Sequence, residues 1–387
     1  MKKKIAILGS TGSIGKTLLN IIEKDKKNFK IQLLTCNKNY NLLLKQAKKF
    51  NVKNLIITNA RQFSKAKKNN KNKTLNIENN FNNIKKISPR KLDYTMSAIV
   101  GLNGLLPTIK IIKHTKKIAI ANKEAIICGW NLIKKELKKN KTIFLPVDSE
   151  HFSIWEILNT KYKNDIEKIY ITASGGPFLR KNKKQIDKTN VKEALKHPNW
   201  KMGKKISIDS ATMMNKVFEV IETKNIFNIS YNKIVILTHP KSYIHAIVKF
   251  KNGIVKILVH ETSMKFPIFN TLYYGLNKSI NSKTMDLKKL NELNLALINK
   301  KKFPIVKILK SLPKSSSLFE TILVTSNDEF VDLFLKKKIK FNQISDHIMK
   351  FIKNKEFQKY KRIRPKNIHE IVELSKYVRL KISSLSI

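Results

Sequence analysis

Short apolar runs alternate with stretches of helical periodicity along the first 150 residues. Each run of five to eight mostly apolar residues is followed by a segment whose apolar positions recur every three or four residues. The apolar runs lie at 4–8, 29–36, 54–58, 94–100, 117–121 and 142–147, and the helical stretches at 16–24, 40–50, 105–114 and 124–139. This β-α alternation predicts an α/β fold, a Rossmann-like parallel sheet covered by helices on both faces.

The rhythm changes after residue 148. Strand-like runs at 168–174, 233–239, 244–250 and 254–260 surround one clear helix at 211–224, which predicts an α+β catalytic domain. Helical spacing then dominates the end of the chain and predicts a C-terminal helical bundle. The expected domains are 1–148, 149–273, a polar linker at 274–300, and 301–387. The polar, low-complexity stretch 69–83 is expected to be an exposed loop.

Charge is the most unusual bulk property of the chain. Its 79 Lys and Arg against 27 Asp and Glu give a formal net charge of +52. Such a charge is compatible with a nucleic-acid partner, but Lys, Asn and Ile are inflated together and the lysines are spread evenly. No localised basic patch or reading motif is present, so we expect no nucleic-acid partner.

Cysteine content and hydropathy indicate a cytoplasmic protein. Cys36 and Cys128 provide neither a disulfide framework nor a zinc pattern. The four apolar residues near the N-terminus are too few for a signal-peptide core, and no apolar stretch approaches the length of a membrane span. We therefore expect no membrane partner.

A glycine loop follows the first predicted strand. Gly9 to Gly15 read GSTGSIG and open the first predicted helix, so that the backbone can approach a phosphate at the helix N-terminus. The spacing G-x-x-G-x-x-G is less common than G-x-G-x-x-G, and an ordinary turn is the alternative. The strand–turn–helix context favours dinucleotide binding.

The residues at the end of the second predicted strand indicate which dinucleotide the protein binds. Folds of this kind that bind NAD usually place an acidic residue there, on the ribose 2′-hydroxyl. This chain has Asn37, Lys38 and Asn39 instead. The alternative is that Lys38 is one more surface lysine, but the missing acid favours NADPH.

Two carboxylates stand out in a chain poor in acids. Asp148 and Glu150 follow the strand predicted at 142–147, and in an extended segment residues two apart project to the same side. Converging carboxylates repel each other unless they are protonated or share a cation, and oxygen ligands suit Mg²⁺ or Mn²⁺. A solvated pair neutralised by nearby lysines is the alternative.

A third carboxylate lies on the helix predicted to begin at Ser210, a good N-cap residue. Asn215, Lys216 and Glu219 share one side of that helix by their i, i+3 and i, i+4 spacing. The other side chains are apolar, which indicates burial rather than a surface Lys–Glu pair.

Two loops complete the set of candidates. Ser174 precedes Gly-Gly-Pro and predicts a tight turn, and His197, Trp200 and Gly203 lie in a polar loop with the makeup of a mobile lid. Taken singly, each of these features is more often structural.

Together the stretches GSTGSIG, ANKE (121–124), PVDSEH, TASGGPF, HPNWKMGKKISIDSATMMNK and FEVIE resemble the 1-deoxy-D-xylulose 5-phosphate reductoisomerase family. The resemblance is dense from residue 5 to about 222. It implies rearrangement of a phosphorylated small-molecule substrate and its reduction by NADPH, giving 2-C-methyl-D-erythritol 4-phosphate in non-mevalonate isoprenoid biosynthesis. It also implies a homodimer.

The resemblance implies roles residue by residue. Asp148, Glu150 and Glu219 are expected to ligate Mg²⁺ or Mn²⁺, which polarises the substrate oxygens. The substrate and its phosphate are expected to contact Lys123, Ser149, Glu150, Ser174, His197, Trp200, Ser210, Asn215, Lys216 and Glu219. NADPH is expected to contact Thr11, Gly12, Ser13, Ile14, Asn37, Lys38, Asn39, Asn122, Glu124 and Gly203.

The sequence departs from the family pattern at two places. Asn37 replaces a usual glycine, and Ser263 and Lys265 replace an Asp and an Arg in a segment that borders the site. Two rival functions remain open: an NADP-dependent oxidoreductase without the rearrangement step, and a basic nucleic-acid binder.

Overall fold

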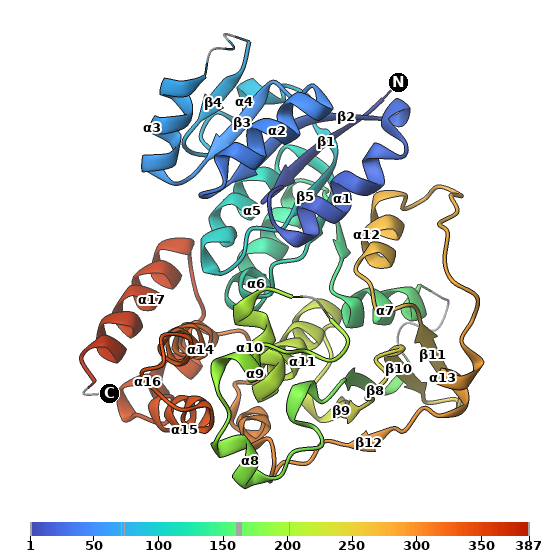
Figure 1. Ribbon diagram of the computed structural model, residues 1–387, viewed down its shortest axis with the longest axis vertical. Helices are drawn as coiled ribbons and strands as arrows, with labels where there is room; N and C mark the ends of the chain where they lie inside the picture. The colour runs from blue at the N-terminus through green and yellow to red at the C-terminus, as the bar shows by residue number, and fades with distance from the viewer. Residues whose placement is uncertain (1, 71, 73, 160–164, 201, 386–387) are drawn as a thin grey trace. The chain divides into compact units, whose positions relative to one another are not determined.

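The computed structural model describes residues 2–70, 72, 74–159, 165–200 and 202–385 (Figure 1). Contacts divide the chain into two compact units. The first comprises Met1–Ala125, Asn131–Asp148 and Met264–Ile280, and the second Ile126–Trp130, Ser149–Ser263 and Asn281–Ile387.

The first unit is built on a parallel sheet. Its strands are β1 (Lys3–Leu8), β2 (Phe29–Cys36), β3 (Asn54–Ile57), β4 (Asn76–Glu78), β5 (Leu92–Ser97), β6 (Thr115–Ile120) and β7 (Ile143–Pro146). They lie in the order β4-β3-β2-β1-β5-β6-β7. The order reverses between β1 and β5, which places the crevice used for ligands in such sheets just beyond these two strands. The predicted Rossmann-like sheet is confirmed.

Helices connect the strands of this sheet. They are α1 (Ser13–Glu23), α2 (Tyr40–Phe50), α3 (Ala60–Asn69), α4 (Ile84–Ile87), α5 (Leu105–Ile112) and α6 (Lys123–Lys139). Because crossovers between parallel strands are right-handed, the helices that run outward from β1 and from β5 cover opposite faces.

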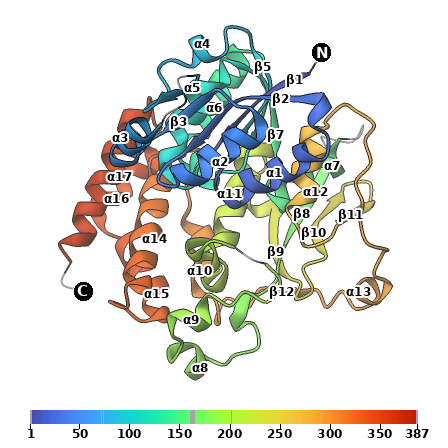
Figure 2. The same cartoon turned by 45° about the horizontal axis from the view of Figure 1, so that its top comes forward.

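A late segment of the chain completes the first unit. Helix α12 (Lys265–Leu272) packs against α1, beside which it lies in Figure 2. Two hydrogen bonds reinforce this packing: the Tyr273 hydroxyl donates to Asp25 (2.8 Å), and the hydroxyls of Tyr94 and Thr271 are 3.1 Å apart.

The composition of residues 69–83 predicted an exposed loop, but the structure contains a short strand there. Strand β4 pairs with β3 in parallel there, with Ile77 buried opposite Leu55. The burial of Ile77 and Phe81 outweighs the polar composition around them.

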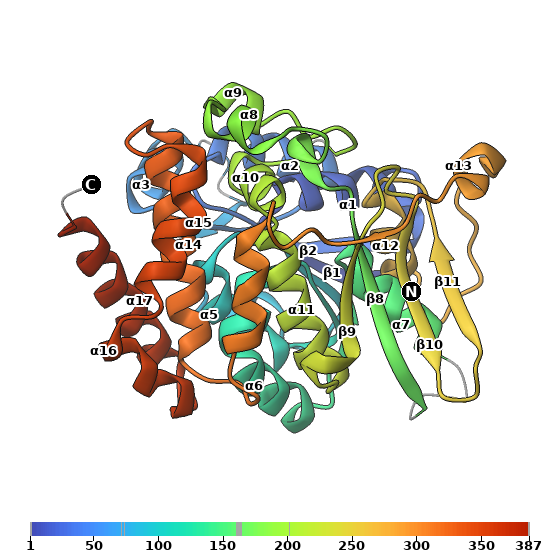
Figure 3. The ribbon, with the colours of Figure 1, turned by 90° about the horizontal axis from the view of Figure 1, so that it is seen from below.

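The second unit contains a mixed sheet, visible in Figure 3. Its strands are β8 (Ile166–Ala173), β9 (Ile234–Thr238), β10 (Ile244–Phe250), β11 (Val255–Val259) and β12 (Ala296–Leu297), in the order β11-β10-β8-β9-β12. The flanking helices are α7 (Ser149–Leu158), α8 (Lys183–Asp187), α9 (Val191–Ala194), α10 (Lys204–Thr212), α11 (Met214–Phe227) and α13 (Leu287–Asn291). Strands β8 and β9 are parallel, so their carboxyl ends lie at the same edge.

The end of the chain is helical, as predicted. It forms α14 (Phe319–Leu335), α15 (Phe341–Phe351), α16 (Lys355–Gln358) and α17 (Ile368–Ser383). Helix α14 packs against both α15 and α17. Among the described residues, no helix is long and apolar enough to cross a membrane.

Candidate functional site

The glycine loop lies at the reversal point of the first sheet. A Cβ atom at Gly9 would come within 2.6 Å of the Ala98 carbonyl oxygen, and one at Gly15 within 2.5 Å of the Ser10 Cα atom. Gly9 also has a φ of +82°, which L side chains rarely adopt. The glycines let the turn pack closely and leave Gly12 and Ser13 exposed at the start of α1. Thr11 and Ile14, which flank these two residues in the sequence, are half-buried.

The predicted nucleotide-selecting residues come directly after β2. Asn37, Lys38 and Asn39 are all exposed at the carboxyl end of that strand. Asn39 caps α2 by accepting from the Leu42 N–H (3.2 Å), and the Asn37 amide donates to Thr58 (3.2 Å). Asn37 lies outside the left-handed region, so the substitution of the usual glycine leaves the backbone unstrained.

The segment after β6 is buried and polar. Asn122 caps α6 by accepting from the Ala125 N–H (2.7 Å), and its amide donates to the carbonyls of Gly101 (2.8 Å) and Ile99. Lys123 and Glu124 follow in the first helical turn, with 9% and 7% of their surfaces exposed. The Lys123 ammonium forms an ion pair with Asp148, which follows the neighbouring strand β7.

The three predicted carboxylates come together. One oxygen from each of Asp148, Glu150 and Glu219 lies within 4.8 Å of the others. Glu150 and Glu219 are buried, and Ser149 donates to Glu150 (2.6 Å). Three carboxylate oxygens at this spacing fit the ligand preference of Mg²⁺ or Mn²⁺.

The backbone that carries two of these carboxylates differs from the extended segment predicted from the sequence. Asp148 and Glu150 are not both in an extended segment, because α7 begins at Ser149 and Glu150 lies in its first turn. The turn from β7 into α7, rather than the two-residue period of a strand, brings the carboxylates together.

A cation already lies among these carboxylates. The Lys216 ammonium is 2.5 Å from Glu150 and also contacts Glu219, whose other oxygen accepts from the Asn215 amide (2.5 Å). Burial alone would lower the pKa of Lys216, but the two carboxylates outweigh it and raise the pKa above its ordinary value. Lys216 therefore stays charged and offsets the repulsion between the acids.

The helix that carries these residues begins later than predicted. Ser210 is not an N-cap, because it lies within α10, which ends at Thr212. Met213 adopts a left-handed conformation (φ 70°) and separates α10 from α11. The break puts Ser210 near the end of one helix and Asn215 at the start of the next, which the hydrophobic pattern across both helices concealed.

Ser174 and His197 form a directed hydrogen-bond pair. The His197 Nδ1 atom accepts from the backbone N–H groups of Asn199 (3.2 Å) and Trp200 (3.0 Å). It therefore carries no proton, and Nε2–H donates to the Ser174 hydroxyl (3.0 Å), which also accepts from the Gly176 N–H (3.1 Å). Burial, with the charge of Lys216, lowers the pKa of His197 to about 4 and keeps the ring neutral. The Ser174 O–H is left to donate to a ligand.

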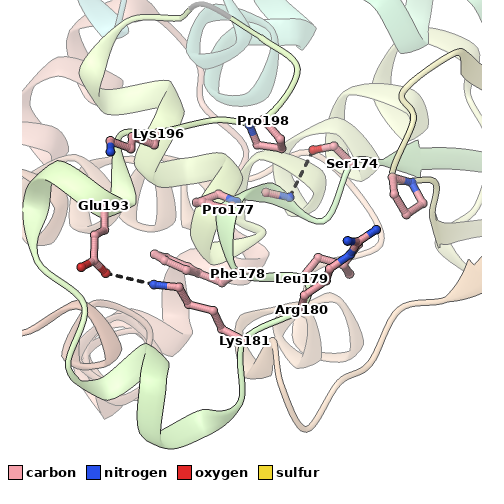
Figure 4. Close-up of a pocket in the computed structure, with 11 residues that line it drawn as sticks. Ser174, Pro177, Phe178, Leu179, Arg180, Lys181, Glu193, Lys196 and Pro198 are labelled. Carbon is pink, nitrogen blue, oxygen red and sulfur yellow. Dashed lines mark hydrogen bonds and ion pairs between the residues drawn. The ribbon is translucent and has the colours of Figure 1, made fainter.

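A cavity of about 460 Å³ adjoins Ser174. Pro177, Phe178 and Pro198 line it together with the cations Arg180, Lys181 and Lys196 (Figure 4). Lys181 is paired with Glu193 at 2.9 Å. The predicted lid residues Trp200 and Gly203 lie between α9 and α10, and Lys201 between them is outside the described residues.

Sequence reasoning missed the polar contacts that support this site. Asn199, between α9 and α10, donates a hydrogen bond to the hydroxyl of Ser242, which follows β9 (2.8 Å). Asp209 is buried beside Ser210 and accepts from Asn327 (2.8 Å). An acidic residue one position before a candidate serine, in a chain poor in acids, was the available sequence signal. Of the two replacements, Ser263 ends a segment of the second unit and Lys265 belongs to a segment of the first.

The family models of 1-deoxy-D-xylulose 5-phosphate reductoisomerase match most of the chain. One matches residues 5–129, the model of the C-terminal domain of that enzyme matches 144–227, and a DXP reductoisomerase C-terminal domain model matches 260–381.

Curated and solved relatives agree with these matches. The 1-deoxy-D-xylulose 5-phosphate reductoisomerase of Pelagibacter ubique (strain HTCC1062) is 59% identical over 387 residues, which is 100% of both chains. A solved structure of the Zymomonas mobilis reductoisomerase with NADPH has a TM-score of 0.87 at 29% identity over 100% of both chains. A crystal structure described as DOX-P reductoisomerase in complex with NADPH, fosmidomycin and magnesium has a TM-score of 0.89 at 31% identity, and the match covers 99% of this chain and 98% of that one.

Proposed function

Because the chain belongs to the 1-deoxy-D-xylulose 5-phosphate reductoisomerase family, we propose that it converts 1-deoxy-D-xylulose 5-phosphate to 2-C-methyl-D-erythritol 4-phosphate with NADPH. The observation that carries the proposal is the buried cluster of Asp148, Glu150 and Glu219. The reaction rearranges a carbon skeleton next to a carbonyl, and a divalent cation held by these carboxylates would polarise the substrate oxygens as a Lewis acid.

The substrate phosphate is assigned to Ser174, Ser210, Asn215 and Lys216, with His197 beside them. The neutral His197 ring supports this assignment, because its Nε2–H and the Gly176 N–H occupy the acceptor capacity of Ser174 and leave its O–H for a phosphate oxygen. Lys216 now contacts Glu150 and Glu219. A divalent cation on those carboxylates would release the ammonium for the phosphate.

The remaining substrate contacts are assigned to Lys123, Ser149 and Trp200. The position of Lys123 supports its assignment, because its ammonium group reaches Asp148 from the first turn of α6. Ser149 fixes one oxygen of Glu150, so it also orients a metal ligand.

NADPH is assigned to the reversal point of the first sheet. The absence of room for a Cβ atom at Gly9 and Gly15 fits a loop that a pyrophosphate approaches closely, next to the N–H groups that begin α1. Exposed Lys38 suits a 2′-phosphate. The cofactor supplies the hydride, and the protein supplies its orientation.

We also propose that the protein acts in the cytoplasm as a homodimer. Strand β11 is an edge strand, and Val255 and Ile257 on it are 51% and 48% exposed. An apolar edge of this kind favours pairing with another strand, and a second copy of β11 provides one about a two-fold axis. Sedimentation of the wild type against Ile257→Lys tests the dimer, since the lysine should produce monomers.

The activity is tested with purified protein, 1-deoxy-D-xylulose 5-phosphate, NADPH and Mg²⁺. We expect loss of NADPH absorbance together with the branched methylerythritol product, identified by mass spectrometry and NMR. NADPH oxidation without the branched product would indicate an oxidoreductase that lacks the rearrangement. Asp332→Asn, on the exposed face of α14, is the matched carboxylate control and should keep full activity.

A further inference from the structure

Asn199 holds the segment that carries His197 and Trp200, and neither the family roles nor the sequence pattern assigns it a part. Its side-chain amide donates to the Pro240 carbonyl (2.7 Å) and to the Ser242 hydroxyl (2.8 Å). The Pro240 carbonyl can only accept, so the amide orientation is fixed. Both partners follow β9, the parallel neighbour of β8.

These bonds reach the substrate site through a short chain of contacts. The Asn199 backbone N–H donates to His197 Nδ1, and His197 Nε2 donates to Ser174, which follows β8. The anchored amide thus fixes the N–H that sets the His197 tautomer, and that tautomer orients Ser174. The Trp200 N–H donates to the same nitrogen, so the position of Trp200 depends on the same anchor.

A strained backbone supports the anchor point. Ser242 has a φ of 49° although it is not glycine. Such a conformation persists only where surrounding contacts hold it. Its N–H donates to the His239 carbonyl (3.0 Å), and its own carbonyl accepts from Thr262 (3.0 Å), which holds the hydroxyl in place beside Asn199.

We propose that Asn199 is a positioning residue for the substrate phosphate, acting through His197 and Ser174 from its anchor on Pro240 and Ser242. The inference rests on the proposed function. Because the phosphate is bound alike in the ground and transition states, loss of the anchor should raise KM and leave kcat nearly unchanged.

Asn199→Asp is the first test, since it keeps the shape and removes both donors. Two lost hydrogen bonds predict a rise in substrate KM of about 10- to 100-fold, with kcat within about threefold of the wild type. Inorganic phosphate, used as a competitive inhibitor, should lose affinity in parallel, whereas the KM for NADPH should not change. Asn182→Asp, an exposed helix cap in the same unit, is the matched control and should behave as wild type.

Ser242→Gly separates positioning from stability. Glycine relieves the strained φ and should maintain or raise the melting temperature, while loss of the hydroxyl should raise substrate KM by about 3- to 10-fold. Normal KM and phosphate inhibition in both variants would overturn the inference. A wild-type protein that does not turn over the substrate would instead overturn the proposed function, and phosphate binding measured by calorimetry would still report on Asn199.

Discussion

Glu219→Gln offers the sharpest test of the carboxylate cluster. Glu219 contacts Lys216 and Asn215, and only 1% of its side chain is exposed. Glutamine keeps the volume but turns one acceptor oxygen into a donor. The Lys216 ammonium then keeps a single carboxylate partner, Glu150. The three carboxylates alone would predict relief of repulsion, but the ammonium between them reverses the expected sign.

The size of the effect follows from the burial of the pair. Removing one partner of a buried ion pair costs about 3–5 kcal/mol. Because Glu150 remains, we expect about half of that, roughly 2 kcal/mol. At about 2–4 °C per kcal/mol, the melting temperature of the metal-free variant should fall by roughly 4–8 °C.

Metal addition distinguishes this account from a purely structural one. Mg²⁺ or Mn²⁺ at about 100 times its Kd should stabilise the wild type by about 2.7 kcal/mol. The variant should lose most of that shift and nearly all turnover. Lys216→Met should also lower the metal-free melting temperature, but its metal-induced rise should be larger than that of the wild type, because the ammonium no longer competes for the acids. Calorimetry of the metal-free and metal-loaded forms measures both.

Two results would refute the reasoning. A metal-free Glu219→Gln protein that melts above the wild type would mean that Lys216 does not offset the repulsion. A normal metal-induced shift in that variant would remove Glu219 from the metal site. Asp332→Asn, which removes an exposed carboxylate on α14, controls for the general effect of lost charge.

Three further predictions concern other parts of the chain. Lys38→Asp should weaken NADPH much more than NADH, which the ratio of kcat/KM values measures, and equal use of both cofactors by the wild type would contradict the assignment of Lys38. Gly15→Ala should abolish NADPH binding in calorimetry, because the added Cβ would lie 2.5 Å from the Ser10 Cα atom. Burial raises the pKa of Glu320 to about 7 from its ordinary 4.5, so the ionised form destabilises the fold at higher pH. Urea unfolding of Glu320→Gln should therefore show a gain of up to about 3 kcal/mol at pH 8 that disappears as the pH falls towards 4.5; a gain that persists at pH 4.5 would contradict the cause.

The sequence predicted best where local chemistry and topology agree. The loop from Gly9 to Gly15 could be placed because a strand, a turn and a helix each have their own pattern there. Asn37, Lys38 and Asn39 could be placed at a strand end by the same pattern. The i, i+3 and i, i+4 relation of Lys216 and Glu219 needed only the helix period.

Prediction from the sequence failed where a backbone break or a long-range contact determines the position of a side chain. The left-handed residue Met213 interrupts what reads as one amphipathic run, so Ser210 was misplaced as a cap. Glu150 was placed in an extended segment because the start of α7 at Ser149 has no distinct signal. The contact of Lys216 with Glu150 joins residues 66 positions apart, and no local pattern reports it.

The return of residues 264–280 to the first unit has a consequence for biosynthesis. The N-terminal sheet emerges from the ribosome with the surface that α12 covers still bare, and the partners of Asp25 and Tyr94 not yet made. At about 5–20 residues per second, the wait between Asp148 and Tyr273 is on the order of ten seconds. During that time residues 149–263 of the second unit emerge as an insertion within an unfinished first unit. A nascent chain arrested before residue 264 should therefore bind chaperones that one arrested after residue 320 escapes.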